Sequence, residues 1–172
     1  MVQESDQWAV VAGATGSLGG AIARKFASKG LKVLAIARNE ANLDALSSSS
    51  PRIVTCVADL SENGAIDIIS DAVGGPVKIV AQAVGLPIRR RDQPFDPSSM
   101  GVAVNIKIGG LLRLTTAVDS RLGPGSRIVA LGGYHGFEPD PTATGPGVVN
   151  SALAISSDSS AFGTAREGFP CI

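Results

Sequence analysis

Continuous apolar runs alternate with segments of helical periodicity along most of the chain. Such runs lack the in-out alternation of a half-exposed sheet, which is typical of parallel strands covered on both faces. They predict strands at Trp8–Ala12, Lys32–Ala37, Arg52–Val57, Val77–Val84 and Ser126–Leu131. The segments between them predict helices at Leu18–Ser28, Glu40–Leu46, Glu62–Val73 and Ser98–Asp119. This order predicts an α/β fold with a doubly wound parallel sheet.

Three stretches interrupt this rhythm. Residues 85–97 are polar and contain prolines, which predicts an irregular loop after the fourth strand. Residues 132–147 are rich in glycine and proline, and we expect a mobile loop over a site, with a helix starting near Val148. From residue 156 the chain is serine-rich and aperiodic. We therefore expect one domain over residues 1–155 and an irregular tail over residues 156–172.

Composition narrows the range of partners. The 15 basic and 15 acidic residues cancel, so we expect no nucleic-acid partner. No apolar span of about 20 residues and no signal-like N-terminus is seen, which predicts a soluble cytoplasmic protein without a membrane partner. Cys56 and Cys171 stand alone, so neither a disulfide framework nor a metal site is predicted.

The first strand is followed by three glycines, Gly13, Gly16 and Gly19, and then by the first helix. Glycine lets the backbone adopt positive φ angles and lets a pyrophosphate approach without meeting a Cβ atom. The helix that follows directs free N–H groups and the positive end of its dipole at such a phosphate. This arrangement predicts a cofactor that carries phosphate, the alternative being an ordinary tight turn.

Several motifs, in order, resemble those of the short-chain dehydrogenase/reductase family of NAD(P)-dependent enzymes, which have a Rossmann-like fold. Gly13–Gly19 is similar to the family's glycine-rich turn, and Val57–Leu60 to the end of its third strand, where an Asp meets the adenine ring. Ala83–Gly85 stands where the family has Asn-Ala-Gly. Val104–Ile106 resembles the helix segment whose Asn supports an active-site water, and Gly125–Val129 the lead-in to the strand of the catalytic Ser.

The resemblance covers residues 7–154 and implies a nicotinamide cofactor. A carboxylate at the end of the second strand would bind the ribose of NAD, whereas an Arg pairs with the 2′-phosphate of NADP. Arg38 and Asn39 stand at this point, which favours NADP(H), the alternative for Arg38 being a solvated surface residue. The residues expected at the cofactor are Gly13, Thr15, Gly16, Ser17, Leu18, Gly19, Arg38, Asn39, Asp59, Leu60, Ala83, Gly85 and Asn105.

The resemblance also implies a catalytic Ser, Tyr and Lys, the last two spaced Tyr-x-x-x-Lys, and this chain lacks that pair. Its single tyrosine is Tyr134, Gly replaces the Ser, and Pro146 and Asn150 stand at the Tyr and Lys positions. The loop after the fifth strand offers Tyr134 and His135 as replacements, since imidazole suits acid–base work. With Asn105 they are the predicted catalytic residues, although a lone loop histidine is also common at ordinary surfaces.

Asn150–Leu153 resembles the start of the corresponding helix in a Tyr-less subgroup associated with fungal indole-alkaloid pathways. An iminium ion already carries positive charge, so hydride transfer to it needs no proton on oxygen. We therefore expect an oxidoreductase that transfers hydride between NADP(H) and a small organic carbonyl, alcohol or imine in secondary metabolism. The alternatives are a catalytically degenerate nucleotide-binding scaffold or partner subunit, and an inactive truncated product.

Family members usually have seven strands, of which this chain predicts about five. We therefore expect a C-terminally truncated member of the family. The fifth strand would then lie at an open edge of the sheet with apolar side chains, which favours pairing with a second copy in a homo-oligomer.

Overall fold

The computed structural model describes residues 7–85, 97–138 and 140–158. Over these residues a single parallel sheet forms, in the order β3-β2-β1-β4-β5. Its strands are β1 Trp8–Ala12, β2 Lys32–Ala37, β3 Ile53–Val57, β4 Val77–Gln82 and β5 Leu122–Ala130. The strand order reverses beside β1, which pairs with β2 on one edge and with β4 on the other. The predicted doubly wound α/β fold is confirmed.

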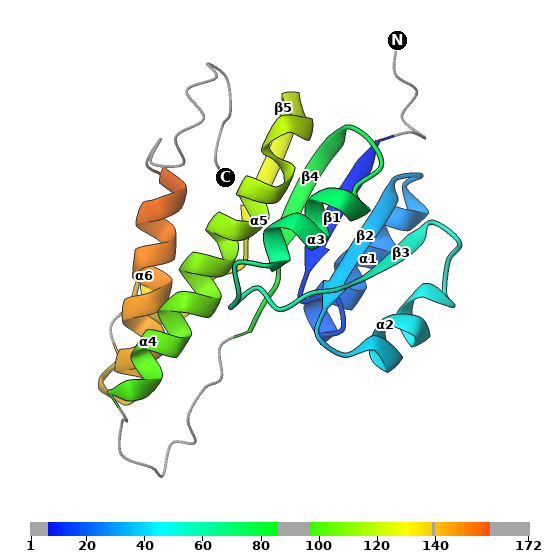
Figure 1. The fold of residues 1–172 in the computed structure, drawn as a ribbon. Coiled ribbons are helices and arrows are strands. Elements are labelled where there is room, and N and C mark those ends of the chain that lie inside the picture. The colour runs from blue at the N-terminus through cyan, green and yellow to red at the C-terminus, as the bar shows by residue number, and fades with distance from the viewer. Residues whose placement is uncertain (1–6, 86–96, 139, 159–172) are drawn as a thin grey trace.

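Helices cover both faces of the sheet (Figure 1). Helices α1 Ser17–Ser28 and α2 Glu40–Ser47 pack on one face, and α3 Ala65–Ala72 and α5 Gly110–Val118 on the other. Helix α4 Ser98–Val104 runs into α5 through a π-helical turn, Asn105–Gly109, so the predicted helix over 98–119 is one continuous rod. Helix α6 Thr144–Asp158 lies beside α4.

The continuous apolar pattern of β1 follows from this two-sided burial. Trp8, Val10 and Ala12 face α3 and α5, whereas Ala9 and Val11 face α1 and α2. All five side chains are buried because each face of the strand meets a helix layer. The continuous apolar pattern of β1 therefore indicates burial on both faces, as its central position in the sheet requires.

Strand β5 begins earlier than the predicted Ser126 because a bulge extends its pairing with β4. The Ser126 hydroxyl donates to the Val77 carbonyl over 2.6 Å and accepts from the Gly123 N–H over 3.0 Å. Gly125 between them has a φ of +84°. The hydrogen bonds of the Ser126 side chain thus add residues 122–125 to β5, although their Gly-Pro-Gly composition is typical of a turn.

The region after β5 contains more helical structure than the loop predicted over residues 132–147. Its described part contains two single-turn 3-10 helices, Tyr134–Gly136 and Pro141–Ala143, and α6 starts at Thr144 instead of near Val148. Helix α6 also includes residues 156–158, so the predicted boundary at 155 falls inside this helix. The rest of the predicted tail and residues 86–96 of the predicted loop after β4 lie outside the described residues.

Length and composition alone would allow one described helix, Ser98–Arg121, to cross a membrane. In this fold Leu111, Leu114 and Val118 from the same helix are buried in the layer between α5 and the sheet. The apolar side chains of this helix are thus explained by their packing in the core of the domain.

Close packing at the start of α1 yields a stability prediction. A Cβ atom at Gly19 would lie 2.1 Å from the carbonyl oxygen of Gly13, so Gly19→Ala should destabilise the protein by at least about 2 kcal/mol. Gly101 lies in α4 with open space around its Cα, so Gly101→Ala should stabilise by up to about 1 kcal/mol. Urea unfolding of both variants measures the difference, and equal effects would contradict this packing.

Candidate functional site

The glycine turn after β1 is held between the two strands that flank β1. The N–H groups of Gly13 and Ala14 donate to the Ile36 carbonyl at the end of β2, over 3.0 and 3.1 Å. Gly13 has a φ of +73°, and a Cβ atom there would lie 2.8 Å from the Ala83 carbonyl carbon and oxygen. The turn therefore crosses the reversal point of the sheet with no space for a side chain.

The N-terminus of α1 opens directly from this turn and has no side-chain cap. Gly16 occupies the N-cap position, and the first turn of the helix contains no acidic residue. The backbone N–H groups of Ser17, Leu18 and Gly19 are the first of the helix, and such groups carry the positive end of the helix dipole. This end of α1 suits an anion such as a phosphate.

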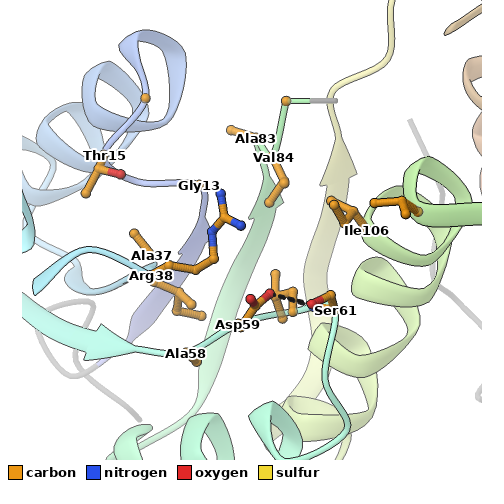
Figure 2. Close-up of a pocket in the computed structure, with 15 residues that line it drawn as sticks. Gly13, Thr15, Ala37, Arg38, Ala58, Asp59, Ser61, Ala83, Val84 and Ile106 are labelled. Carbon is orange, nitrogen blue, oxygen red and sulfur yellow. Dashed lines mark hydrogen bonds between the residues drawn. The ribbon is translucent and has the colours of Figure 1, made fainter. Parts of the chain in front are cut away.

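A cavity of about 540 Å³ opens at the carboxyl ends of the strands, beside the turn (Figure 2). In an open α/β sheet this is the edge where ligands bind. The cavity reaches from the ends of β2 and β3 across the glycine turn to the end of β4. Its far wall includes α4 and the π-helical turn that follows α4. Its lining residues are Gly13, Thr15, Gly16, Ile36, Ala37, Arg38, Ala58, Asp59, Leu60, Ser61, Ala83, Val84, Gly85, Val102 and Ile106.

One end of the cavity carries an acidic and a basic side chain. Asp59 follows β3, and its Oδ1 accepts hydrogen bonds from the Ser61 N–H and hydroxyl over 2.9 and 2.8 Å. The Ser61 N–H, the Ser61 hydroxyl and the charge of Arg38 lower the pKa of Asp59, whereas burial acts against them. Asp59 is therefore a carboxylate that accepts hydrogen bonds, and the exposed Arg38 at the end of β2 extends over the same end (Figure 2).

Eight of the residues predicted at the cofactor line this cavity: Gly13, Thr15, Gly16, Arg38, Asp59, Leu60, Ala83 and Gly85. Five others are not in its lining. Ser17, Leu18 and Gly19 form the first turn of α1, next to the cavity. Asn39 is the N-cap of α2, where its side chain accepts from the Asn42 N–H over 2.9 Å. The sequence pattern missed Val84, Val102 and Ile106 because their apolar side chains carry no chemical signal.

Asn105, the last of the five predicted cofactor residues outside the cavity lining, lies in a hydrogen-bond network with Arg113. Its Nδ2 donates to the Ser61 carbonyl over 3.0 Å, and its Oδ1 accepts from Arg113 Nη1 over 2.9 Å. Arg113 also donates to the Leu60 carbonyl over 3.0 Å and to Asn63 Oδ1 over 2.7 Å. These bonds tie the segment after β3 to α5, so Arg113, which the sequence analysis did not select, holds one wall of the cavity in place.

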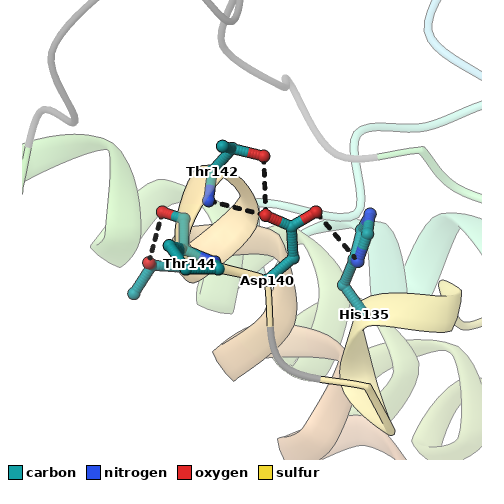
Figure 3. Close-up of polar contacts among 5 residues, drawn as sticks. His135, Asp140, Thr142 and Thr144 are labelled. Carbon is teal, nitrogen blue, oxygen red and sulfur yellow. Dashed lines mark hydrogen bonds and ion pairs between the residues drawn. The ribbon is translucent and has the colours of Figure 1, made fainter.

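Tyr134 and His135 lie together on the first 3-10 helix after β5. Their rings contact edge to face with centroids 6.0 Å apart, and the Tyr134 side chain is exposed. Nδ1 of His135 lies 3.9 Å from Oδ2 of Asp140 (Figure 3). The other carboxylate oxygen of Asp140 accepts from the Thr142 N–H and hydroxyl, both over 2.7 Å. The carboxylate is thereby fixed beside the imidazole.

Lys107 is a further polar residue at this edge of the sheet that the sequence analysis did not select. It is buried, and its Nζ donates to the carbonyls of Val84 and Leu131, the residues just beyond β4 and β5. Its position between Ile106 and Ile108, as one charge in an apolar helix segment, is the sequence signal that could have identified it. Within the part of the chain that the structure describes, no three His, Cys, Asp or Glu side chains form a metal-binding group.

The family model for short chain dehydrogenases matches residues 7–145. No curated protein matches the chain. A short-chain dehydrogenase from Streptomyces avermitilis superposes with a TM-score of 0.83 at 22% identity, over 98% of this chain and 64% of that one. A Brucella melitensis short-chain dehydrogenase/reductase, described as a glucose/ribitol dehydrogenase, gives 0.79 at 22% identity, over 88% and 64%.

A short chain dehydrogenase from Burkholderia cenocepacia, solved in complex with NADP, gives a TM-score of 0.77 at 20% identity, over 91% of this chain and 67% of that one. At these identities the likeness establishes the fold. The chain spans under two thirds of the length of the Streptomyces and Brucella proteins.

The lowered pKa of Asp59 predicts how stability depends on pH. A carboxyl with a folded-state pKa below its ordinary 3.8 stabilises the protein above that value, and this stabilisation is lost as pH falls through the folded-state pKa. Wild type should therefore be more stable than Asp59→Asn at neutral pH, with the difference shrinking in acid. Urea unfolding from about pH 7 to about pH 2 measures it. Ser61→Ala, which removes one donor, should show a smaller change, and a pH-independent difference for Asp59→Asn would contradict the assignment.

Proposed function

Because the chain belongs to the short-chain dehydrogenase family, we propose that it binds NADP(H) in the cavity and transfers hydride between this cofactor and a small organic substrate. The observation that carries the proposal is the continuity of the cavity. It runs from Arg38 and Asp59 past Gly13 to Gly85, along the crevice where open α/β sheets bind dinucleotides. The substrate class we propose is a carbonyl, an alcohol or an imine.

The residues present suit the pyrophosphate and the adenine of the cofactor. The uncapped N-terminus of α1 and the glycine turn would receive the pyrophosphate. The Asp59 carboxylate would accept a hydrogen bond from the exocyclic amine of the adenine. When bound, a nicotinamide cofactor supplies or accepts the hydride. The chain's own contribution is to hold and orient it.

Arg38 favours NADP(H) over NAD(H). A guanidinium at the end of β2 can pair with a 2′-phosphate, whereas a carboxylate there would bind the two ribose hydroxyls and repel the phosphate. The Burkholderia protein of the same fold was solved with NADP. Both points support the 2′-phosphorylated cofactor.

For a carbonyl substrate, we propose His135 as the group that gives or takes the proton on oxygen. The Asp140 carboxylate lies 3.9 Å from the imidazole and would orient it, and the hydrogen bonds that it accepts from Thr142 keep it in place. Tyr134 and Asn105 are the weaker candidates, because the Tyr134 side chain faces solvent and the Asn105 side chain bonds Ser61 and Arg113. For an iminium substrate no such group is required.

The absence of the Tyr-x-x-x-Lys pair from the sequence supports one other candidate function. A catalytically degenerate subunit would bind the nucleotide in the same cavity without transferring hydride. Turnover distinguishes the two functions, and binding alone does not.

Three further expectations from the sequence stay predictions: a role in secondary metabolism, a homo-oligomer and a cytoplasmic location.

The first test concerns cofactor choice. Arg38→Glu should weaken NADPH binding by at least about tenfold, because a phosphate-paired cation is replaced by an anion. Its affinity for NADH should not fall by more than about threefold, because the new carboxylate can bind the ribose hydroxyls. Fluorescence titration of both cofactors measures this. Arg127→Glu, on β5 and outside the lining of the cavity, is the control and should change neither affinity. Equal loss of NADPH and NADH affinity on Arg38→Glu would contradict the pairing.

The second test concerns the proton. His135→Gln should lower kcat for an aldehyde or ketone by roughly a hundredfold, since general acid catalysis is lost. Reduction of a preformed cyclic iminium ion should change by less than about threefold, because that substrate needs no proton. Steady-state oxidation of NADPH with each substrate gives both rates. Glu138→Gln, at an exposed residue of the same segment, is the control and should leave both rates unchanged. Equal losses for the two substrates in His135→Gln would count against His135.

A further inference from the structure

A buried lysine lies where β4 and β5 end. The Lys107 side chain is 4% exposed, and its Nζ donates to the Val84 carbonyl over 3.0 Å and to the Leu131 carbonyl. It belongs to the π-helical turn between α4 and α5, which faces the carboxyl ends of these strands. A buried cation at the ligand-binding edge of a sheet is rare enough to need a reason.

The main chain of Lys107 is also fixed to the sheet. Gln82, at the last position of β4, is fully buried, and its Nε2 donates to the Lys107 carbonyl over 2.9 Å. Backbone and side chain of Lys107 are thus both bound to the ends of the central strands.

The charge of this lysine has no carboxylate beside it among the described residues. Burial lowers the pKa of Lys107, because desolvation disfavours the ammonium. The two carbonyl oxygens act in the opposite direction, since their lone pairs accept from the ammonium. The result is an ammonium held by two backbone carbonyls, with no carboxylate of the described residues paired to it.

This ammonium lies behind one part of the cavity wall. Val84, whose carbonyl it contacts, and Ile106, its neighbour in the helix, both line the cavity. A dinucleotide with its adenine half at Asp59 and its pyrophosphate at the glycine turn extends its other half toward Val84 and Gly85. The nicotinamide ring would therefore be the part of the cofactor nearest to Lys107.

We propose that Lys107 makes the site prefer the reduced cofactor, NADPH, over the oxidised form, NADP⁺; this inference rests on the proposed function. The nicotinamide ring is uncharged in NADPH and cationic in NADP⁺. A fixed cation behind the wall repels the cationic ring and leaves the neutral ring unaffected, and low polarity strengthens this repulsion. Lys107 does not line the cavity, so it acts through its field and through Val84 and is not a catalytic residue.

The test compares the affinities of the two redox forms. NADPH is titrated by fluorescence and NADP⁺ by displacement of NADPH, for wild type, Lys107→Met and Lys107→Gln. Wild type should bind NADPH roughly tenfold more tightly than NADP⁺. In both variants this ratio should approach one, through tighter binding of NADP⁺. Lys107→Gln keeps an N–H donor and so separates the charge from the hydrogen bonds.

Lys78→Met is the matched control, because it removes one exposed lysine charge from the amino-terminal part of β4. It should leave the ratio unchanged. A gain of affinity for NADP⁺ distinguishes the field from a structural role, since a damaged site would lose both forms together.

Three results would overturn the proposal: a wild-type ratio of one or below, an unchanged ratio in both variants, or equal loss of both forms. The first is measured on wild type alone and does not depend on folding of the variants. The proposed function fails separately, and the inference with it, when wild type binds neither form.

Discussion

The close approach of the glycine turn to its neighbours is the constraint on which the site depends. Gly13 packs against the backbone of Ala83 and Val84, and Gly19 packs against the carbonyl of Gly13. Side chains at either position would separate β1 from β4 or α1 from the turn. With both absent, an uncapped helix N-terminus opens beside the strand ends, and the cavity forms between them. Backbone contact at two glycines thereby places a phosphate-binding helix end next to Arg38, Asp59 and Gly85.

The sequence predicts most of the fold because local patterns encode it. Two-sided burial gives β1 its continuous apolar run, and the glycine spacing marks the turn. The missed features depend on contacts between distant segments. The Ser126 hydroxyl extends β5 by bonding to Val77, and residues 134–136 become ordered against α6, where a Cβ atom at Gly136 would meet Asn150 at 2.8 Å. The hydrophobic periodicity of the sequence does not indicate such contacts between distant residues.

In the candidate site, too, local patterns predict some residues, whereas residues that act through distant contacts are missed. The end of the cavity at Arg38 and Asp59 follows strands whose ends can be located from the pattern, so these residues could be selected from the sequence. Arg113 could not, because its partners are far away along the chain. The single charge of Lys107 in an apolar helix segment marks that residue, but its partners Val84 and Leu131 are equally distant in the sequence. Cofactor binding and proton transfer are also separable. The proposed cofactor cradle depends on backbone geometry, whereas the proposed proton donor is one imidazole beside Asp140 on the segment after β5.

Calorimetric titration with adenosine 2′,5′-bisphosphate, the fragment of NADP(H) without the nicotinamide half, tests whether the cavity binds the 2′-phosphorylated cofactor. With its adenine at Asp59 and its 2′-phosphate at Arg38, the fragment should bind and compete with NADPH. Adenosine 5′-phosphate, which lacks the 2′-phosphate, should bind at least about tenfold more weakly. Equal affinity for the two fragments, or no binding of either, would contradict the account.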